Sequence, residues 1–313
     1  MVNKYLTQYK VSNLFAMMIN NLRKPKTCED DFEDHLVVIT GATSGIGYQT
    51  ARLYASHGAD ILCINRNEEK SINLCDEIRR DFGVNCEYKI ADFARIVDVK
   101  RVGKDLIDSD FIVDVLIHNA GIFSTGKEIT EDGNELVFQV NYLASFLLNY
   151  MLKEKLRDQG TTRILFVNSE GHRFAAWGIP LDDLTYENHK YSGNKSYGVS
   201  KTAQLLSMMK FNEYFQDSGV TINAMHPGDV KSNIGMNNGR WYRWYKKYFI
   251  DPSLKSPKRS ARALYYLGVS DEIKRISGKF FNLTKEEKPA PPARDREVAE
   301  ELWRISIKLL GLE

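Results

Sequence analysis

The sequence has no long hydrophobic run. The longest apolar stretch near its beginning, Leu14 to Ile19, is far shorter than the roughly 18 residues that a membrane-spanning helix needs. No apolar segment of about 7–15 residues follows the first residues, as a secretory leader would require. These absences predict a soluble cytoplasmic protein with no integral membrane span.

Cysteines and net charge are also scarce. The four cysteines among 313 residues, Cys28, Cys63, Cys75 and Cys86, match no metal-binding spacing, so we expect no metal and a reducing compartment. The formal net charge of +2 gives no electrostatic reason to expect a nucleic-acid partner. No internal repeat or low-complexity segment is present, and the length suits one α/β domain with appendages.

A glycine-rich turn follows the first predicted strand. Residues His35 to Thr40 are apolar and β-branched, typical of a buried strand, and a helical pattern ends near Tyr54. Between them lies Gly41-Ala42-Thr43-Ser44-Gly45-Ile46-Gly47. A strand, glycine turn and helix present backbone N–H groups and a positive helix end to a phosphate. We therefore expect a dinucleotide pyrophosphate here, with an unliganded glycine turn as the alternative.

The end of the second predicted strand bears on the choice of cofactor. Residues 60–65 are followed by Arg66, and no Asp or Glu stands at the strand end. A carboxylate there would hold the ribose 2′-hydroxyl of NAD, whereas an arginine accommodates the 2′-phosphate of NADP. Arg66 therefore favours NADP(H) over NAD(H), unless it is only a solvated surface charge.

Strands and helical patterns alternate from His35 to about Leu283. Further strands are predicted over residues 87–90, 113–117, 163–167 and 221–225. This order predicts an α/β, Rossmann-type fold, a doubly wound parallel sheet with helices on both faces. The strands are followed by Asp92-Phe93, Asn119-Ala120-Gly121, Ser169 and His226-Pro227-Gly228. We expect these motifs at the carboxyl edge of the sheet, where such folds bind ligands.

Tyr197 and Lys201 form a candidate proton-transfer pair. Four residues apart on a helix, they share one face. A free tyrosine has a pKa near ~10, and an ammonium about 4 Å away contributes roughly 4 kcal/mol at an effective dielectric of 20, or about three pKa units. We therefore expect Lys201 to lower the pKa of Tyr197 and make it a general acid/base.

Together with Asn141, these motifs resemble the short-chain dehydrogenase/reductase family over roughly residues 35–310. The resemblance implies that Tyr197 protonates a carbonyl oxygen and that Lys201 also holds the nicotinamide ribose. It further implies that Ser169 hydrogen-bonds the substrate and that Asn141 braces a water chain leading to Lys201. The implied cofactor-binding residues are Gly41, Thr43, Ser44, Gly45, Ile46, Gly47, Arg66, Asp92, Phe93, Asn119, Ala120, Gly121, Tyr197, Lys201, Pro227, Gly228, Val230 and Ser232.

Two features depart from the family pattern. Asn168 stands where a second serine is common, and Ser232 where a threonine is common. The 28-residue separation of Ser169 and Tyr197 exceeds that of the family's basic form and leaves room for an inserted loop.

Within the family, the sequence resembles the retinol dehydrogenase branch in residues 116–121, the long segment before Tyr197 and the tail 302–312. This implies an NADP(H)-dependent oxidoreductase for an apolar retinoid-, steroid- or lipid-like ketone, aldehyde or alcohol. Two alternatives stay open: a cofactor-binding sensor or scaffold without turnover, and reduction of a C=C bond in a conjugated ring. Sensors and scaffolds of this kind typically lose the catalytic residues that this chain retains. For the C=C reduction, this chain has no matching cysteine beside Tyr197.

Three appendages surround the predicted domain of residues 35–313. Residues 1–34 show helical spacing and predict an N-terminal helical extension that packs on the body or a partner, or lies at a membrane interface. Aromatic and basic residues alternate over 236–250, within a substrate lid at about 230–255 that would cover an apolar substrate or touch a membrane surface. The closing helix has an apolar stripe of Val298, Leu302, Ile305 and Leu309, with Gly311 as its cap. The family resemblance implies a homodimer or homotetramer through the Tyr197 helix, unless the appendages cover it.

Overall fold

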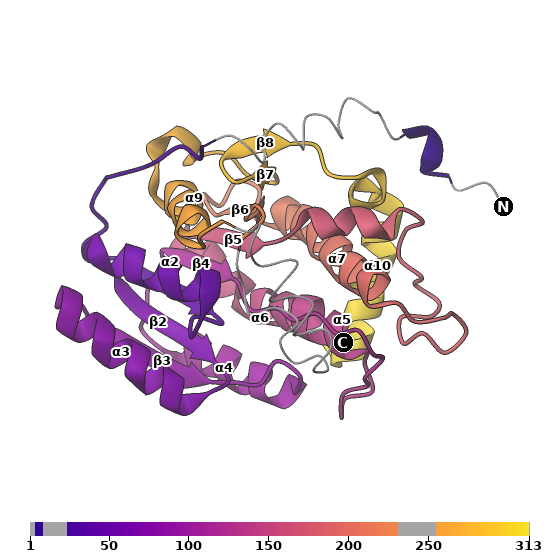
Figure 1. The fold of residues 1–313 in the computed structure, drawn as a ribbon, viewed down its shortest axis with the longest axis horizontal. Helices are drawn as coiled ribbons and strands as arrows, with labels where there is room; N and C mark the ends of the chain where they lie inside the picture. The colour runs from indigo at the N-terminus through magenta and orange to yellow at the C-terminus, as the bar shows by residue number, and fades with distance from the viewer. Residues whose placement is uncertain (1–3, 9–23, 231–254, 313) are drawn as a thin grey trace.

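The structure is a computed structural model that describes residues 4–8, 24–230 and 255–312 (Figure 1). In these ranges an eight-stranded sheet has the order β3-β2-β1-β4-β5-β6-β7-β8, and every pairing is parallel except that of β7 with β8. The strands are β1 (Leu36–Thr40), β2 (Asp60–Asn65), β3 (Cys86–Ile90), β4 (Val115–His118), β5 (Arg163–Val167), β6 (Thr221–His226), β7 (Phe280–Asn282) and β8 (Lys285–Glu287). The predicted doubly wound sheet is confirmed.

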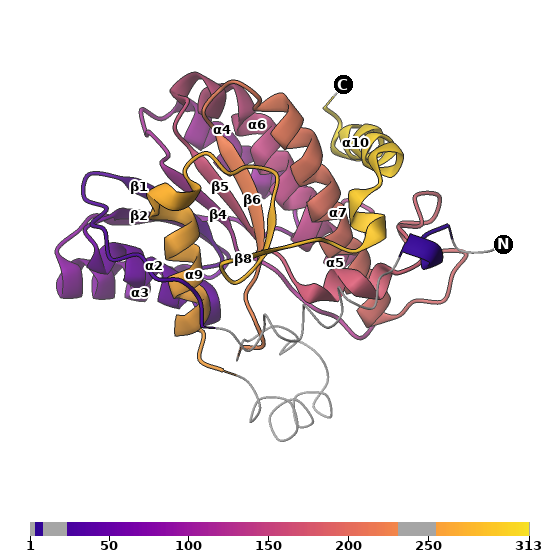
Figure 2. The ribbon, with the colours of Figure 1, turned by 90° about the horizontal axis from the view of Figure 1, so that it is seen from above.

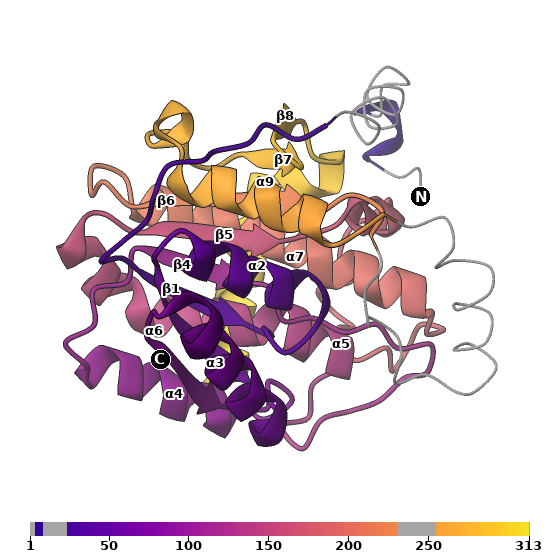
Figure 3. The same cartoon turned by 60° about the vertical axis from the view of Figure 1, so that its left-hand side comes forward.

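Helices cover both faces of this sheet (Figures 2 and 3). One face carries α2 (Gly45–Ser56), α3 (Glu68–Phe82) and α9 (Lys258–Val269). The other carries α4 (Ile96–Asp108), α6 (Ala144–Gln159) and α7 (Gly193–Tyr214), with α10 (Arg296–Leu310) outside α7. Short helical segments are η1 (Leu6–Gln8), α5 (Leu136–Phe138), η2 (Gln139–Leu143), η3 (Glu170–Ala175), η6 (Asp271–Ile273) and η7 (Pro291–Arg294).

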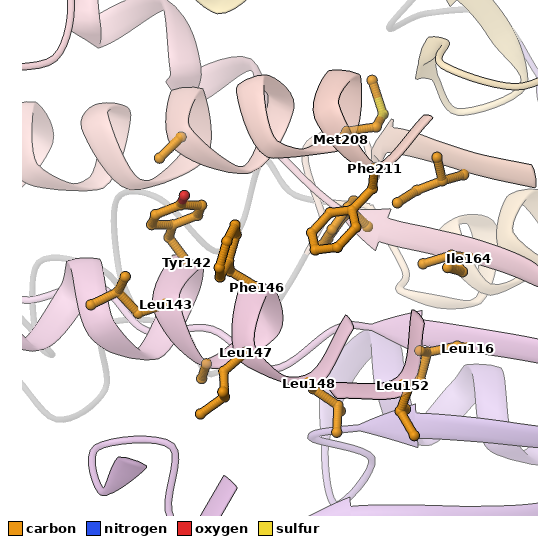
Figure 4. Packing of buried hydrophobic residues seen from close by; sticks show 14 of the residues in the cluster. Leu116, Tyr142, Leu143, Phe146, Leu147, Leu148, Leu152, Ile164, Met208 and Phe211 are labelled. Carbon is orange, nitrogen blue, oxygen red and sulfur yellow. The ribbon is translucent and has the colours of Figure 1, made fainter. Parts of the chain in front are cut away.

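Two hydrophobic cores form because strands buried on both faces direct alternate side chains to opposite sides. In β1, Val37 and Ile39 face the α2–α9 core, whereas Val38 faces the α4–α6–α7 core. Figure 4 shows the second core, where residues 142–152 pack between α7 and the sheet. Each fully buried Leu, Ile or Phe side chain contributes about 1.5–3 kcal/mol to folding, so these two layers hold the strand ends in register.

The closing helix packs with a different set of residues from the one predicted. Leu302 is buried, but Leu309 is 43% exposed, and Ala299, Ser306 and Leu310 complete the buried face. The buried face includes a polar residue that the apolar stripe did not predict: Ser306, whose Oγ lies 2.7 Å from the Tyr142 hydroxyl in the core. The predicted cap is confirmed, since Gly311 is left-handed with φ 59°.

Part of the N-terminal extension packs on the domain. Tyr5 is buried, and its hydroxyl donates to Asp295 Oδ2 at 2.9 Å, at the start of α10. Farther along, Phe32 stacks on His35, and Asp30 O accepts a hydrogen bond from the Tyr265 hydroxyl on α9. The predicted helical spacing of residues 1–34 falls largely on residues outside the described ranges. No helix in the described part of the chain is long and apolar enough to cross a membrane.

The predicted lid also lies mainly outside the described ranges. This applies to Ser232 and to the aromatic and basic residues 236–250. At its edges, Val230 forms a parallel bridge with Lys255, so these two described residues lie side by side.

Candidate active site

The predicted motifs meet at the carboxyl edge of the sheet. The register pairs Ile39 of β1 with Ile117 of β4, His118 with Phe166 of β5, and Val167 with Met225 of β6. The segments that leave these strands carry the glycine turn, Asn119, Ser169 and Pro227. Tertiary structure thus brings together residues that are up to 186 positions apart in sequence, from Gly41 to Pro227, as expected for a ligand site in a doubly wound sheet.

The glycine turn requires glycine at particular positions. Gly41 and Gly45 have positive φ angles of 69° and 60°, a region that other residues rarely adopt. A Cβ on Gly47 would lie 2.4 Å from Gly41 O and 2.5 Å from Asn119 Nδ2. The Ser44 side chain makes no capping hydrogen bond to α2, so it does not occupy the first N–H groups of that helix.

Asn119 joins the glycine turn to β4. Its Nδ2 donates to Thr40 O at 3.0 Å and to Gly41 O at 2.8 Å. The backbone N–H groups of Asn119 and Ala120 both donate to Thr40 Oγ1 at 3.0 Å. The Asn119 side chain therefore fixes the glycine turn against the central strand.

Two polar residues at the end of β2, Asn65 and Arg66, have different roles. Asn65 is buried and turns back, accepting a hydrogen bond from Ala42 N at 2.7 Å, so it braces the glycine turn. Arg66 is exposed, and no hydrogen bond or ion pair within the described ranges engages its guanidinium. The position after β2 therefore presents an available cation beside the turn.

Asp92 and Phe93 follow β3, on the same edge. The Asp92 carboxylate accepts a hydrogen bond from Ala94 N at 3.0 Å, and its N–H donates to Asp98 Oδ2 at 2.9 Å. Phe93 is buried among the residues of the α4–α6–α7 core. These contacts hold the loop after β3 in place next to the end of β2.

Ser169 and Tyr197 meet across the inserted loop. Ser169 Oγ accepts a hydrogen bond from Gly171 N at 3.0 Å, and the Ser169 side chain acts to lower the pKa of Tyr197. Two glycines allow this approach: a Cβ on Gly171 would lie 2.7 Å from the Tyr197 ring, and one on Gly198 would lie 2.9 Å from Gly171 O. Sequence reasoning gave neither glycine a role: Gly198 lies within the Tyr197–Lys201 motif, but its contact with the loop after Ser169 forms only on folding.

Lys201 is close to Tyr197, but the expected pKa shift of the tyrosine is wrong for this structure. Lys201 Nζ lies 5.8 Å from the centre of the Tyr197 ring and donates instead to Val167 O at 2.9 Å. Burial raises the pKa of Tyr197, opposed by its hydrogen bond to Ser169. Burial also lowers the pKa of Lys201 to about 7, so the ammonium is itself readily neutralised. Desolvation outweighs the expected charge effect because both groups are enclosed.

Asn141 lies in a π turn, η2, that precedes α6. Its Oδ1 accepts from Ile122 N at 2.7 Å, and its Nδ2 donates to Ile122 O at 3.0 Å and Ser200 Oγ at 3.1 Å. A Cβ on Gly121 would lie 3.3 Å from Asn141 Oδ1 and 3.9 Å from Lys201 Nζ. Gly121 therefore lets the β4 loop, α7 and the π turn converge, and π turns of this kind are frequent at functional sites.

The loop after β6 closes the other side of the site. Pro227 O accepts from Ser260 Oγ at 2.7 Å, and Gly228 has a positive φ of 76°. His226 Nδ1 accepts from Glu170 N at 3.3 Å, and burial lowers its pKa to about 4, so it is neutral. Neutral His226 thus links this loop to the residue after Ser169.

Two further side chains, which the sequence did not mark as site residues, lie next to Lys201 and Ser169. Gln204 lies one turn after Lys201, and Asn168 precedes Ser169. Both are buried and hydrogen-bonded to each other at 3.1 Å. Gln204 had a readable signal, because residues three apart share a helix face. Asn168 was visible in the sequence only as a departure from the family pattern, and its side-chain partners, Lys201 O and Gln204, lie on α7.

Comparisons with known proteins agree with this geometry. A family model described as short chain dehydrogenase matches residues 35–179. The chain is 36% identical to retinol dehydrogenase 13 of Homo sapiens over 284 residues, which cover 88% of this chain and 85% of that protein.

Two solved structures have a similar fold. An uncharacterized protein from Mycobacterium Paratuberculosis has a TM-score of 0.70 and 26% identity, covering 90% of this chain and 95% of its own. A short chain dehydrogenase from Escherichia coli CFT073, complexed with NADPH, has a TM-score of 0.63 and 22% identity, covering 82% and 99%. The chain therefore belongs to the short-chain dehydrogenase/reductase family, in its retinol dehydrogenase branch, and is an oxidoreductase that interconverts alcohols and carbonyl compounds with a nicotinamide cofactor.

Proposed function

We propose that this protein is an NADP(H)-dependent reductase of an apolar ketone or aldehyde, of retinoid-, steroid- or lipid-like character, or the dehydrogenase of the corresponding alcohol. The observation that carries the proposal is the meeting of Ser169, Tyr197, Lys201 and Asn141 beside the glycine turn. A sensor or scaffold would not need these four side chains gathered at one place.

The residues present suit a dinucleotide. Gly41, Gly45 and Gly47 leave a concave backbone that a Cβ would fill, at an α2 N-terminus that the Ser44 side chain does not cap. Exposed Arg66 supports a 2′-phosphate, for which its planar fork provides two parallel donors. The related Escherichia coli fold complexed with NADPH is consistent with this preference. Asp92 and Phe93 would border the adenine, and Pro227, Gly228, Val230 and Ser232 the nicotinamide.

In the proposed reduction, the bound nicotinamide supplies a hydride to the carbonyl carbon. Ser169 donates a hydrogen bond to the carbonyl oxygen and orients it toward the Tyr197 hydroxyl. Tyr197 gives its proton to that oxygen as negative charge develops, which yields the alcohol. Lys201 in its charged form stabilises the resulting tyrosinate, and Asn141 holds the loop that borders Lys201.

The apolar character of the substrate is supported by side chains next to the site. Phe174 on η3 and Trp177 just after it are 58% and 68% exposed, unusually open for residues so large. Gly198, beside Tyr197, would place a Cβ 2.9 Å from Phe174 Cβ. Phe174 therefore lies beside the turn of α7 that carries Tyr197, where an apolar substrate could contact it.

The test is consumption of NADPH and NADH by the purified protein with retinal, steroid ketones, medium-chain aldehydes and aromatic ketones. NADPH-dependent turnover that is lost in Tyr197→Phe supports the proposal. Tight NADPH binding without turnover on any of these compounds would instead support a sensor or scaffold. Reduction of a conjugated C=C bond, seen in the product, would support that alternative chemistry.

Oligomeric state and location are further parts of the proposal. One face of α7 is covered by α10, through the Lys210–Glu300 ion pair at 2.7 Å and Trp303, whose ring lies 4.8 Å from that of Phe211. A homodimer or homotetramer would therefore form through surfaces other than this face, which light scattering would test. The four free cysteines support a reducing, cytoplasmic location, which cell fractionation would test.

A further inference from the structure

A buried amide connects the catalytic side chains. Gln204 is 1% exposed, and its Oε1 accepts a hydrogen bond from Lys201 Nζ at 3.1 Å. The same oxygen accepts from Asn168 Nδ2 at 3.1 Å. At the other end of the amide, Nε2 donates to the backbone carbonyl of Asn141 at 2.7 Å. One side chain therefore contacts Lys201, the π turn and the strand end that carries Ser169.

Asn168 extends this connection to Ser169. Its Nδ2 also donates to Lys201 O at 2.9 Å, and its Oδ1 accepts from Ser169 N at 2.8 Å. Asn168 is 2% exposed and Asn141 is fully buried, so water does not compete for these bonds. The hydrogen-bonded path from the backbone of Ser169 to the ammonium of Lys201 thus runs through two side-chain amides.

We propose that Gln204 is a positioning residue for the reaction, holding the Lys201 ammonium and coupling it to Ser169 and the π turn. An ammonium has three donors, and Val167 O and Gln204 Oε1 direct two of them into the protein. The direction of the third donor is then set by the other two. An amide supplies both an acceptor for Lys201 and a donor for Asn141, and it does not titrate, so the bridge sets geometry without carrying protons.

The chemistry of the residue type gives separate predictions for two replacements. Leucine has a similar size but removes both hydrogen bonds. Glutamate keeps an acceptor for Lys201 and adds a negative charge, but it cannot donate to Asn141 O when ionised. Within the described residues, the titratable side chain in contact with Lys201 is Tyr197, on the same helix. The contact from β5 is the backbone carbonyl of Val167, which does not titrate, and the π turn contacts Gln204 through the backbone carbonyl of Asn141.

The experiment measures the Lys201 pKa directly, by NMR of protein labelled with ¹³C at lysine Cε, with Lys201→Met identifying the signal. Gln204→Leu is expected to lower that pKa by about one unit or more, because a charge-assisted hydrogen bond to the ammonium is lost. Gln204→Glu is expected to raise it by a similar amount. The pH dependence of kcat should move with the pKa, with kcat falling about tenfold in Gln204→Leu near pH ~7 while KM for the carbonyl changes less.

Thr202→Val is the matched control. It removes a buried hydrogen bond on α7, from Thr202 Oγ1 to His172 O at 3.1 Å, away from Lys201. It should lower Tm without moving the Lys201 pKa. An unchanged Lys201 pKa in both Gln204→Leu and Gln204→Glu would overturn the proposal. If Gln204→Leu does not fold, an unchanged Lys201 pKa in Gln204→Glu alone would overturn the proposal.

The kinetic part of this inference rests on the proposed function, but the pKa measurement does not. If the wild-type protein reduces no carbonyl compound, the proposed function fails. A Lys201 pKa that still shifts in the Gln204 variants would then leave the positioning role standing. The two failures are therefore distinguishable.

Discussion

The glycine turn at residues 41–47 and the centre around Tyr197 lie on the same edge of the sheet, yet they are held in different ways. The turn depends on positive backbone angles at Gly41 and Gly45 and on the absence of a side chain at Gly47. The Tyr197 centre depends on buried side chains from β5, the π turn and α7, joined by hydrogen bonds. The first is a property of a short segment, and the second exists only when three elements are packed together.

This difference has an energetic consequence. A methyl group added at Gly47 would overlap backbone atoms, and moving those atoms would destabilise the fold. In the Tyr197 centre, an isosteric change that keeps the packing can still alter hydrogen bonds and pKa values. Substitutions in the turn should therefore change stability and cofactor affinity together, whereas substitutions around Tyr197 should change catalysis with smaller effects on cofactor affinity.

The largest expected effect tests the Tyr197 side of this comparison. Tyr197→Phe removes the proton donor but keeps the ring that packs edge-on against Phe123 at 5.9 Å. We expect kcat to fall by about 10²–10⁴-fold, the usual contribution of a general acid, while the Kd for NADPH stays within about threefold. Steady-state kinetics and cofactor fluorescence measure the two quantities. A variant that keeps its turnover would remove Tyr197 from the mechanism.

Arg66 tests whether the cofactor end discriminates by charge. Arg66→Ser should weaken NADPH binding by about 10–100-fold and leave NADH binding nearly unchanged, because charge-assisted contacts to a phosphate are lost. Lys70→Ala, an exposed cation on the neighbouring helix α3, is the control and should change neither. Equal affinity of the wild-type protein for NADH and NADPH would contradict the role given to Arg66.

Gly47→Ala tests the backbone side of the comparison. The added Cβ would lie 2.4 Å from Gly41 O, so the turn must shift, at a cost of about 1–3 kcal/mol in the free energy of unfolding. Cofactor affinity should fall in the same variant. Gly126→Ala is the control, because nothing lies within 4 Å of the position its Cβ would take. Denaturant unfolding and NADPH titration measure both; equal stability of the two variants would contradict the argument.

The last prediction concerns pH and leaves cofactor binding and turnover aside. Burial lowers the folded-state pKa of Lys201 to about 7, whereas a free lysine titrates near ~10.4. Between these values the unfolded state binds more protons, so this residue makes stability rise with pH across that window, by at most about 1.4 kcal/mol per pH unit. Lys201→Met should show a smaller rise between pH ~7 and ~9.5 than the wild-type protein in denaturant unfolding. Parallel pH curves would mean that Lys201 is not desolvated.

Much of the fold could be predicted because its signals are local. The strand at residues 163–167 and the one at 60–65 were bounded correctly by their apolar, β-branched runs. The predicted buried face of α10 was partly wrong. Ser306 is buried and hydrogen-bonded to Tyr142, and a prediction that assigns only apolar residues to the core places such a serine on the surface. Cys63, Cys75 and Cys86 showed no motif, yet Cys75 and Cys86 have their sulfur atoms 3.1 Å apart, since β2, α3 and β3 are adjacent only after folding.

The sequence by itself determined the parallel sheet and the glycine turn, because backbone preference and hydrophobic spacing act between near neighbours. Its resemblance to the family predicted the roles of Ser169, Tyr197 and Lys201. Only the tertiary structure decided the protonation tendencies of Tyr197 and Lys201 and the membership of Asn168 and Gln204 in the site. Desolvation depends on what surrounds a group, and these surroundings come from α7, β5 and the π turn together. No local pattern contains that information.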